Sequence, residues 1–113
     1  MTPRLQSAVW VRAQIRRLAV DGIPAVVARH GDDTAGQVLV KLNMREAGCT
    51  VLSAVTGMDG DRAWLRATGE APVPEAAADD YIARQAKTDP DLWVLEIEDR
   101  DGRHGLAEPV LEG

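Results

Sequence analysis

Three kinds of residue are scarce in this chain of 113 residues, and each scarcity excludes a class of protein. The only cysteine is Cys49, so no disulfide can form within the chain, and a reducing compartment is expected. Because there are only two histidines, a zinc site would have to recruit carboxylate ligands. Phenylalanine is absent, so the core must be built mainly from Val, Leu, Ile and Ala.

Long apolar runs and an excess of positive charge are lacking as well. No stretch approaches the roughly 20 apolar residues of a membrane-spanning helix, and no secretory signal is visible. The net charge of −5 disfavours a broad nucleic-acid-binding face. A local basic patch could still bind nucleic acid, so an adaptor for nucleic acid stays open as a minor hypothesis. The patch would consist of Arg4, Arg12, Arg16 and Arg17. We therefore expect a cytoplasmic protein without a membrane partner.

The residues that are present are typical of one packed domain. The chain is 45% hydrophobic and 27% charged, which favours a globular core over disorder. We expect a single domain over residues 1–113, in which the tail 107–113 is loose. No phosphate-binding loop or dinucleotide fingerprint occurs in the sequence, so no cofactor is expected.

The spacing of apolar residues predicts two helices and five strands. The first helix is predicted over residues 3–20, where Thr2 and Pro3 suit a helix start, and the second over residues 75–87. Strands are predicted where apolar or alternating runs lie between turn residues. These runs are residues 23–30, 37–43, 49–55, 62–68 and 92–99, with a short sixth strand at 103–106.

The predicted order α-β-β-β-β-α-β favours an α+β fold. Because short Gly-containing turns join the first four strands, we expect an antiparallel sheet of five strands, or six if residues 103–106 are included. Both helices are placed on one face of this sheet, so that a single core buries both apolar stripes.

The densest charged stretch is LEIEDRDGRH, residues 95–104. Glu96 and Glu98 share one face of the predicted strand, Asp99 follows it, and an Asp-Gly turn returns His104 toward Glu98. Such a group could perform general acid–base catalysis or bind a cation through its carboxylates. The alternative is an exposed hairpin end whose acids pair with arginines.

Metal-binding and nucleophile motifs fail when they are tested against the sequence. An EF-hand loop counted from Asp99 needs Gly at its sixth position and Glu at its twelfth, where the chain has His104 and Val110. The stretch His30-Gly31-Asp32-Asp33 is more typical of a turn than of a zinc site. No serine lies in a nucleophile elbow, and Cys49 has no adjacent base. No metal site is expected.

Three basic side chains are predicted to face the glutamates of the last strand. Arg12 lies along the apolar stripe of the first helix, where a charge must reach an acid or solvent. Arg29 and Lys41 lie near the ends of the first two strands. A constellation of these three cations with Glu96 and Glu98 is either an ion-pair network of the scaffold or a polar pocket with shifted pKa values.

Two tryptophans are expected to play different roles. Trp93 alternates with Leu95 and Ile97 and is expected in the core. Trp10 lies off the main apolar stripe of the first helix, and an exposed tryptophan is a common interface anchor. The edge of the fourth strand is a second candidate contact surface, since an unprotected edge can pair with another chain.

Two stretches carry a family resemblance. They are WVRAQIRRLAVDGIPAVVARHGDDTAGQVLVKLN, residues 10–43, and DPDLWVLEIEDRDGRH, residues 89–104, whereas residues 44–74 do not carry the pattern. Together they resemble the uncharacterised alphaproteobacterial family "domain of unknown function 1491". The resemblance implies a small cytoplasmic bacterial protein, without an activity or cofactor to transfer. The matching motif residues are Trp10, Arg16, Arg17, Arg29, Gly31, Gly36, Lys41, Trp93, Glu96, Glu98, Asp99 and His104.

Two functional hypotheses rank above the nucleic-acid adaptor. The leading one is a non-catalytic binding or protein-interaction module, whose partner is another protein or a second copy in a homodimer. The alternative is a small hydrolytic or metal-assisted enzyme that uses Glu96, Glu98, Asp99 and His104.

Overall fold

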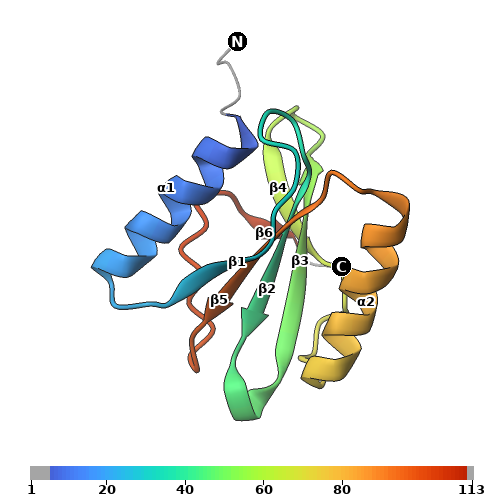
Figure 1. Cartoon of the computed structure of the whole chain (residues 1–113). Helices are drawn as coiled ribbons and strands as arrows, with labels where there is room; N and C mark the ends of the chain where they lie inside the picture. Colours follow the sequence, from blue (N-terminus) through green and yellow to red (C-terminus); the bar gives the residue numbers. More distant parts are fainter. Residues whose placement is uncertain (1–5, 112–113) are drawn as a thin grey trace.

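The computed structural model describes residues 6–111 as a six-stranded mixed sheet between two helices, an α+β fold (Figure 1). The helices are α1 (Ser7–Val20) and α2 (Glu75–Thr88), and neither combines the length and apolar character needed to cross a bilayer. The strands are β1 (Ala25–Arg29), β2 (Val38–Asn43), β3 (Cys49–Thr56), β4 (Arg62–Arg66), β5 (Trp93–Glu98) and β6 (Val110–Leu111). A 3-10 turn, η1 (Arg45–Ala47), connects β2 to β3.

The strand order β1-β5-β2-β3-β4-β6 shows that the prediction of a wholly antiparallel sheet is wrong. β5 lies between β1 and β2; it is antiparallel to β1 and parallel to β2, and β6 is parallel to β4. Burial explains this order. Four of the six β5 residues are buried, whereas no β1 residue is fully buried. A strand that is apolar on both faces belongs inside a sheet, and a half-exposed strand belongs at its edge.

The placement of both helices on one face is also wrong, because α1 and α2 lie on opposite sides of the strands (Figure 1). α1 packs in a core that contains Val40 and Leu95, and α2 packs in a second core that contains Leu39 and Val94. Adjacent residues of a strand point to opposite faces. β2 and β5 therefore form an apolar layer that needs a helix on each side.

The first helix begins later than predicted. α1 starts at Ser7, and Gln6 before it has extended backbone angles, so a continuous helix over 3–20 is wrong at its N-terminal end. Thr2 and Pro3 lie outside the described residues.

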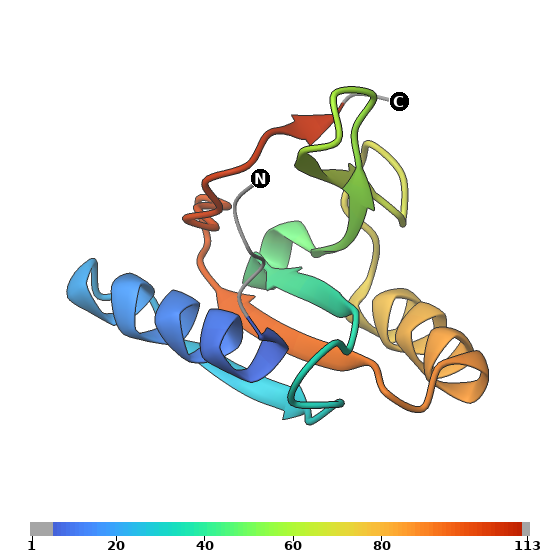
Figure 2. The same cartoon turned by 90° about the horizontal axis from the view of Figure 1, so that it is seen from above.

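The sixth strand is also misplaced in the prediction. Residues 103–106 form no strand, whereas β6 lies within the segment 107–113 that is expected to be loose. Figure 2 shows the connection from β5 running across to β6. β6 pairs with Trp64 and Leu65, so β4 is not the open edge that the sequence suggests. A strand of two residues is too short to produce a detectable alternation.

Trp10 is buried rather than exposed. Its exposed fraction is 8%, and its ring centroid lies 5.7 Å from that of Trp64 on β4. The guanidinium group of Arg62 covers both rings, at 5.4 Å from the Trp10 centroid and 6.0 Å from that of Trp64. Trp10 lies off the main stripe of α1 because the core extends sideways to β4. It is therefore a packing residue and no interface anchor.

Replacing Trp10 tests this assignment. Trp10→Ala should lower the free energy of unfolding by about 3–5 kcal/mol, because a large buried ring leaves a cavity. Val20→Ala is the control on the same helix, since Val20 is 84% exposed, and it should change stability by less than about 0.5 kcal/mol. Both values can be measured by urea denaturation. Similar losses in the two variants would contradict the packing role.

Candidate functional site

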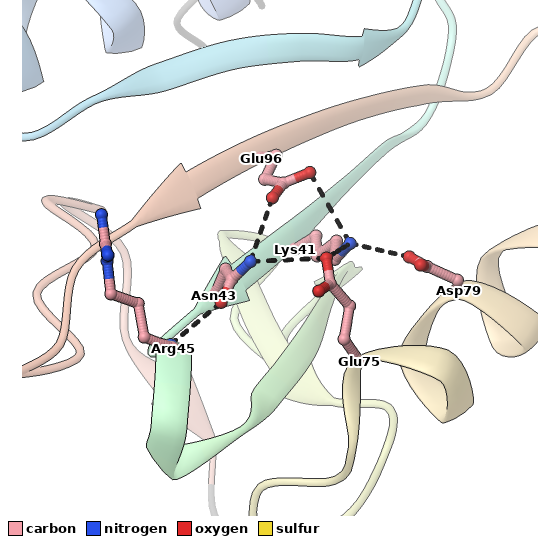
Figure 3. A network of polar contacts seen from close by, with 6 residues as sticks. All are labelled: Lys41, Asn43, Arg45, Glu75, Asp79 and Glu96. Atoms are coloured by element: carbon pink, nitrogen blue, oxygen red, sulfur yellow. Dashed lines mark hydrogen bonds and ion pairs between the residues drawn. The ribbon is translucent and has the colours of Figure 1, made fainter.

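Lys41 is the one charged residue that is buried among residues 6–111, with an exposed fraction of 5%. Its Nζ lies 2.7 Å from Glu75 Oε2, 2.7 Å from Asp79 Oδ1 and 3.6 Å from Glu96 Oε1 (Figure 3). Glu75 and Asp79 are one turn apart at the start of α2, and Glu96 is the register partner of Lys41 on β5. One ammonium group therefore joins the helix to two neighbouring strands.

Asn43 extends this network along β2. Its Nδ2 donates to Glu96 Oε2 at 3.2 Å and to Glu75 Oε2 at 3.4 Å, and its Oδ1 accepts the backbone N–H of Arg45 at 2.9 Å. The guanidinium group of Arg45 lies 2.7 Å from Glu98 Oε1. Both glutamates of β5 therefore meet a cation on the α2 face of the sheet.

The electrostatics of Lys41 argue against a catalytic amine. Burial alone lowers the pKa of Lys41, but hydrogen bonds to Asp79 and Glu75 and the charge of Glu96 outweigh it. The net effect raises the pKa above the ordinary lysine value. The amine therefore stays protonated near neutral pH and cannot act as a nucleophile or a general base. Its arrangement is that of a clamp between α2 and the sheet.

The other two predicted cations lie away from these acids. Arg12 is on the exposed side of α1, and the sheet separates it from Glu96. Arg29 donates to the carbonyl oxygens of Pro90 at 3.1 Å and Leu92 at 2.7 Å, and so attaches the end of β1 to the turn before β5. Arg12 cannot reach the glutamates because α1 and α2 cover opposite faces.

The four residues considered for catalysis do not converge on one point. Asp99 accepts three hydrogen bonds from Arg103, one from its backbone N–H at 2.7 Å and two from its guanidinium group at 3.2 and 2.8 Å. These bonds lower the pKa of Asp99. Glu96 and Glu98 lie on the α2 face, whereas His104 lines a cleft on the α1 face with Leu42. General acid–base catalysis by this set therefore has no common reaction centre.

Cys49 and the acids do not form another reactive site. Cys49 is buried, and burial raises the pKa of its thiol, which disfavours the reactive thiolate. Within residues 6–111, no group of three or more His, Cys, Asp or Glu side chains is arranged to hold a metal ion. The carboxylates of Glu75, Asp79 and Glu96 instead surround the ammonium of Lys41.

Four residues of this network are not predicted from the sequence: Asn43, Arg45, Glu75 and Asp79. One signal was available, because Lys41 interrupts the otherwise apolar strand VLVKL, and a buried charge requires acids nearby. Glu75 and Asp79 are spaced by four residues beside Ala78, the buried position of α2. That spacing predicts a shared helix face, but the partner strand depends on the topology of the sheet.

His104 has a defined protonation and orientation. Its Nδ1 accepts the backbone N–H of Leu106 at 3.0 Å, so the neutral ring carries its proton on Nε2. Burial, together with the positive charge of Arg66, lowers the pKa of His104. The ring is therefore a neutral hydrogen-bond donor at physiological pH.

Comparisons with known proteins agree with the resemblance. A model of the family described as "Protein of unknown function (DUF1491)" matches residues 5–107. A crystal structure of a DUF1491 family protein from Caulobacter crescentus CB15 is 47% identical, covers 96% of this chain and 100% of that chain, and has a TM-score of 0.86. An NMR structure of a DUF1491 family protein from the same organism is 46% identical, covers 98% and 100%, and has a TM-score of 0.84.

A protein from a second organism has the same fold at lower sequence identity. A solution structure of a protein from A. tumefaciens is 26% identical, covers 94% of this chain and 97% of that chain, and has a TM-score of 0.73. No curated protein matches the chain. The family resemblance is therefore confirmed, and it brings no activity with it.

The Lys41 clamp predicts a difference between the two lysines of the chain. Lys41→Met should lower the free energy of unfolding by about 1–3 kcal/mol, because three carboxylates lose their shared cation. This range lies below that of a fully buried pair because Glu75 and Asp79 are more than half exposed. Lys87→Met, on the exposed side of α2, is the matched control and should change stability by less than about 0.5 kcal/mol. If urea denaturation gives equal losses of unfolding free energy for Lys41→Met and Lys87→Met, the assignment of Lys41 as a clamp is wrong.

The lowered pKa of His104 predicts a pH dependence of folding. Between pH 7 and pH 5 the unfolded chain takes up a proton on His104 more readily than the folded protein does. The free energy of unfolding therefore decreases as the pH is lowered from 7 to 5. His104→Asn keeps an acceptor for the Leu106 N–H and should show a smaller fall over this range. Above pH 7 the two proteins should have parallel pH profiles. An identical fall in the variant between pH 7 and pH 5 would refute the assignment.

Proposed function

The chain belongs to the DUF1491 family, and we propose that it is a non-catalytic protein-interaction module that binds an extended segment of a partner protein along β1. The single observation that carries this proposal is the open edge of β1. The lone cysteine suits a reducing compartment, and we place the protein in the cytoplasm.

The hydrogen-bond register of β1 leaves one side of the strand unpaired. Glu98 N–H donates to the Pro24 carbonyl at 3.0 Å, and bonded pairs alternate in an antiparallel ladder. The Val26–Glu96 pair therefore exchanges hydrogen bonds, whereas the backbone N–H and C=O groups of Ala25 and Val27 point away from β5. Such an edge is a template for an added strand.

The side chains of this edge add apolar surface on both faces. Val26 is 57% exposed and Val27 is 41% exposed. A bulge after Val27 interrupts the register before Arg29, which is itself attached to the turn before β5. The accessible template is therefore the short segment 25–27, enough for the main-chain bonds of a short peptide strand.

Charge indicates the chemistry of the partner. Trp10 and Arg17 turn one flank of α1 toward β4 and Gly105. The helical repeat places Arg12 and Arg16 on the side of α1 away from Trp10, where both are exposed. α1 itself lies against β1 (Figure 2). In the part of the chain that the structure describes, these two arginines have no hydrogen-bond or ion-pair partner. We infer a partner strand that has acidic side chains toward α1 and apolar side chains toward Val26.

A second copy of this chain is a poorer occupant of the same edge. A two-fold axis through paired β1 strands keeps both α1 helices on the same face of the joined sheet. The Arg12 and Arg16 flanks of the two copies would then face each other, and like charges repel. Light scattering should therefore give the monomer mass of 12.2 kDa. A dimer that Val27→Pro dissociates would assign the edge to self-association instead.

The partner chemistry can be tested with synthetic peptides. A labelled peptide of about nine alternating Glu and Val residues should bind in fluorescence anisotropy, and the alternating Lys and Val peptide should not. Binding should slow hydrogen exchange at the amides of Ala25 and Val27. Val27→Pro removes an outward-facing donor, which edge strands tolerate, and should weaken binding by about tenfold.

Charge reversal provides an independent variant that leaves the strand intact. Arg12→Glu with Arg16→Glu should abolish preference for the acidic peptide, whereas Arg84→Glu, on exposed α2 surface, should not. If neither peptide binds and the two amides remain unprotected, the proposed edge function is wrong.

A further inference from the structure

A cleft lies on the α1 face of the sheet, beneath the segment that connects β5 to β6. Its volume is about 290 Å³, near the lower end of the range for small-molecule sites. Leu42, Thr50 and Leu52 from β2 and β3 form its floor, and Met44 and Val110 add apolar walls. It is separate from the edge of β1, because β5 and β2 lie between that edge and β3.

The rim of the cleft carries both signs of charge. Arg66 from the end of β4 and His104 from the β5–β6 connection supply donors. Glu70 and Asp101 supply carboxylates on the same rim. An apolar floor with a few polar groups above it is the usual composition of a site for a small organic ligand.

Three of the donors in this cleft have no protein acceptor. Thr50 is only 5% exposed, and its hydroxyl group makes no hydrogen bond to any residue from 6 to 111. The Nδ1 of His104 is occupied by the Leu106 N–H, so the remaining Nε2–H is the ring's donor. Arg66 has no side-chain partner within the same range. Among residues 6–111, no buried side-chain polar atom lacks a hydrogen-bond partner, so the Thr50 hydroxyl is open to the water that fills the cleft. A ligand group with acceptor oxygens can take the place of that water.

We propose that this cleft binds a small aliphatic carboxylate, with the acid group between Arg66, His104 and Thr50 and the alkyl chain on Leu42 and Leu52. A guanidinium group recognises a carboxylate through paired N–H donors, and a hydroxyl and a neutral imidazole each add one donor. The apolar floor buries the alkyl chain.

The remaining charges narrow the ligand class. Glu70 and Asp101 repel a multiply charged anion such as a phosphate ester, so a single carboxylate is favoured. These two acids are also suited to an ammonium group. The carboxylate therefore comes from a simple fatty acid or from an amino acid with a branched aliphatic side chain. Two ligands with the same carbon skeleton, one with and one without an ammonium group, distinguish these sources.

The test titrates the isotope-labelled full chain with isocaproate, L-leucine and isocaproamide, which share the same branched skeleton, and follows amide shifts by NMR. Isocaproate or leucine should give saturable shifts at Leu52, His104 and Val110. A Kd of the order of 1 mM is expected, since about eight or nine non-hydrogen atoms bury little surface. Tighter binding of leucine identifies an amino acid, and tighter binding of isocaproate identifies a simple acid; either result supports the site.

Variants separate the site from nonspecific binding. Arg66→Gln should weaken binding by about tenfold or more, because it removes a charged hydrogen-bond donor. Thr50→Val, which preserves shape, should weaken it by a smaller factor. Arg84→Gln makes the same charge change on α2 and should leave the affinity unchanged. Binding of the neutral amide as tightly as the acid, or no saturable shift with any ligand, overturns the proposal. None of these results bears on the proposed binding of a partner strand to β1, because the variants and ligands of this test do not involve that edge.

Discussion

The parallel contact between β2 and β5 is the constraint on which the rest of the structure depends. Both strands are buried on both faces, and they are joined by a long connection through β3, β4 and α2. Two apolar faces need two covers, so α1 and α2 must lie on opposite sides of the sheet. The insertion of β5 beside β2 also displaces β1 to the edge. The separate helices and the open edge therefore have a single cause.

The buried Lys41 is the main exception to this apolar layer, and its surroundings show how the exception is accommodated. Desolvating an isolated ammonium group is strongly unfavourable, so the lysine can be buried only with acids within hydrogen-bond distance. Glu96 from the parallel partner strand and Glu75 and Asp79 from the covering helix provide them. Because these acids come from two other elements, the ion cluster specifies how α2 sits on β2 and β5. Its charge is engaged in that contact, so its chemistry is structural.

The sequence predicts the elements of this fold far better than their arrangement. Seven of the predicted elements lie close to the observed helices and strands, because periodicity and turn residues are local signals. The pairing of Val38 with Trp93 joins residues far apart in the chain, and no local pattern encodes it. The same gap explains the errors at the site. Alternation along β5 separates Glu96 from Trp93, but the partners of Glu96 depend on which face each helix covers. Arg12 was assigned to the wrong face for this reason.

The topology also explains why the two proposed binding surfaces should act independently on such a small chain. The edge of β1 and the cleft by His104 are separated by the β5–β2 layer, which has few ways to move because it is packed on both faces. A ligand in the cleft would contact β2, β3 and the β5–β6 connection, whereas a strand on β1 would contact only β1 and the flank of α1. A rigid layer between them transmits little change, so occupation of one surface should leave the affinity of the other unchanged. Coupling would instead require β5 to shift against β2, and the Lys41 cluster, which joins β2, β5 and α2, opposes that movement.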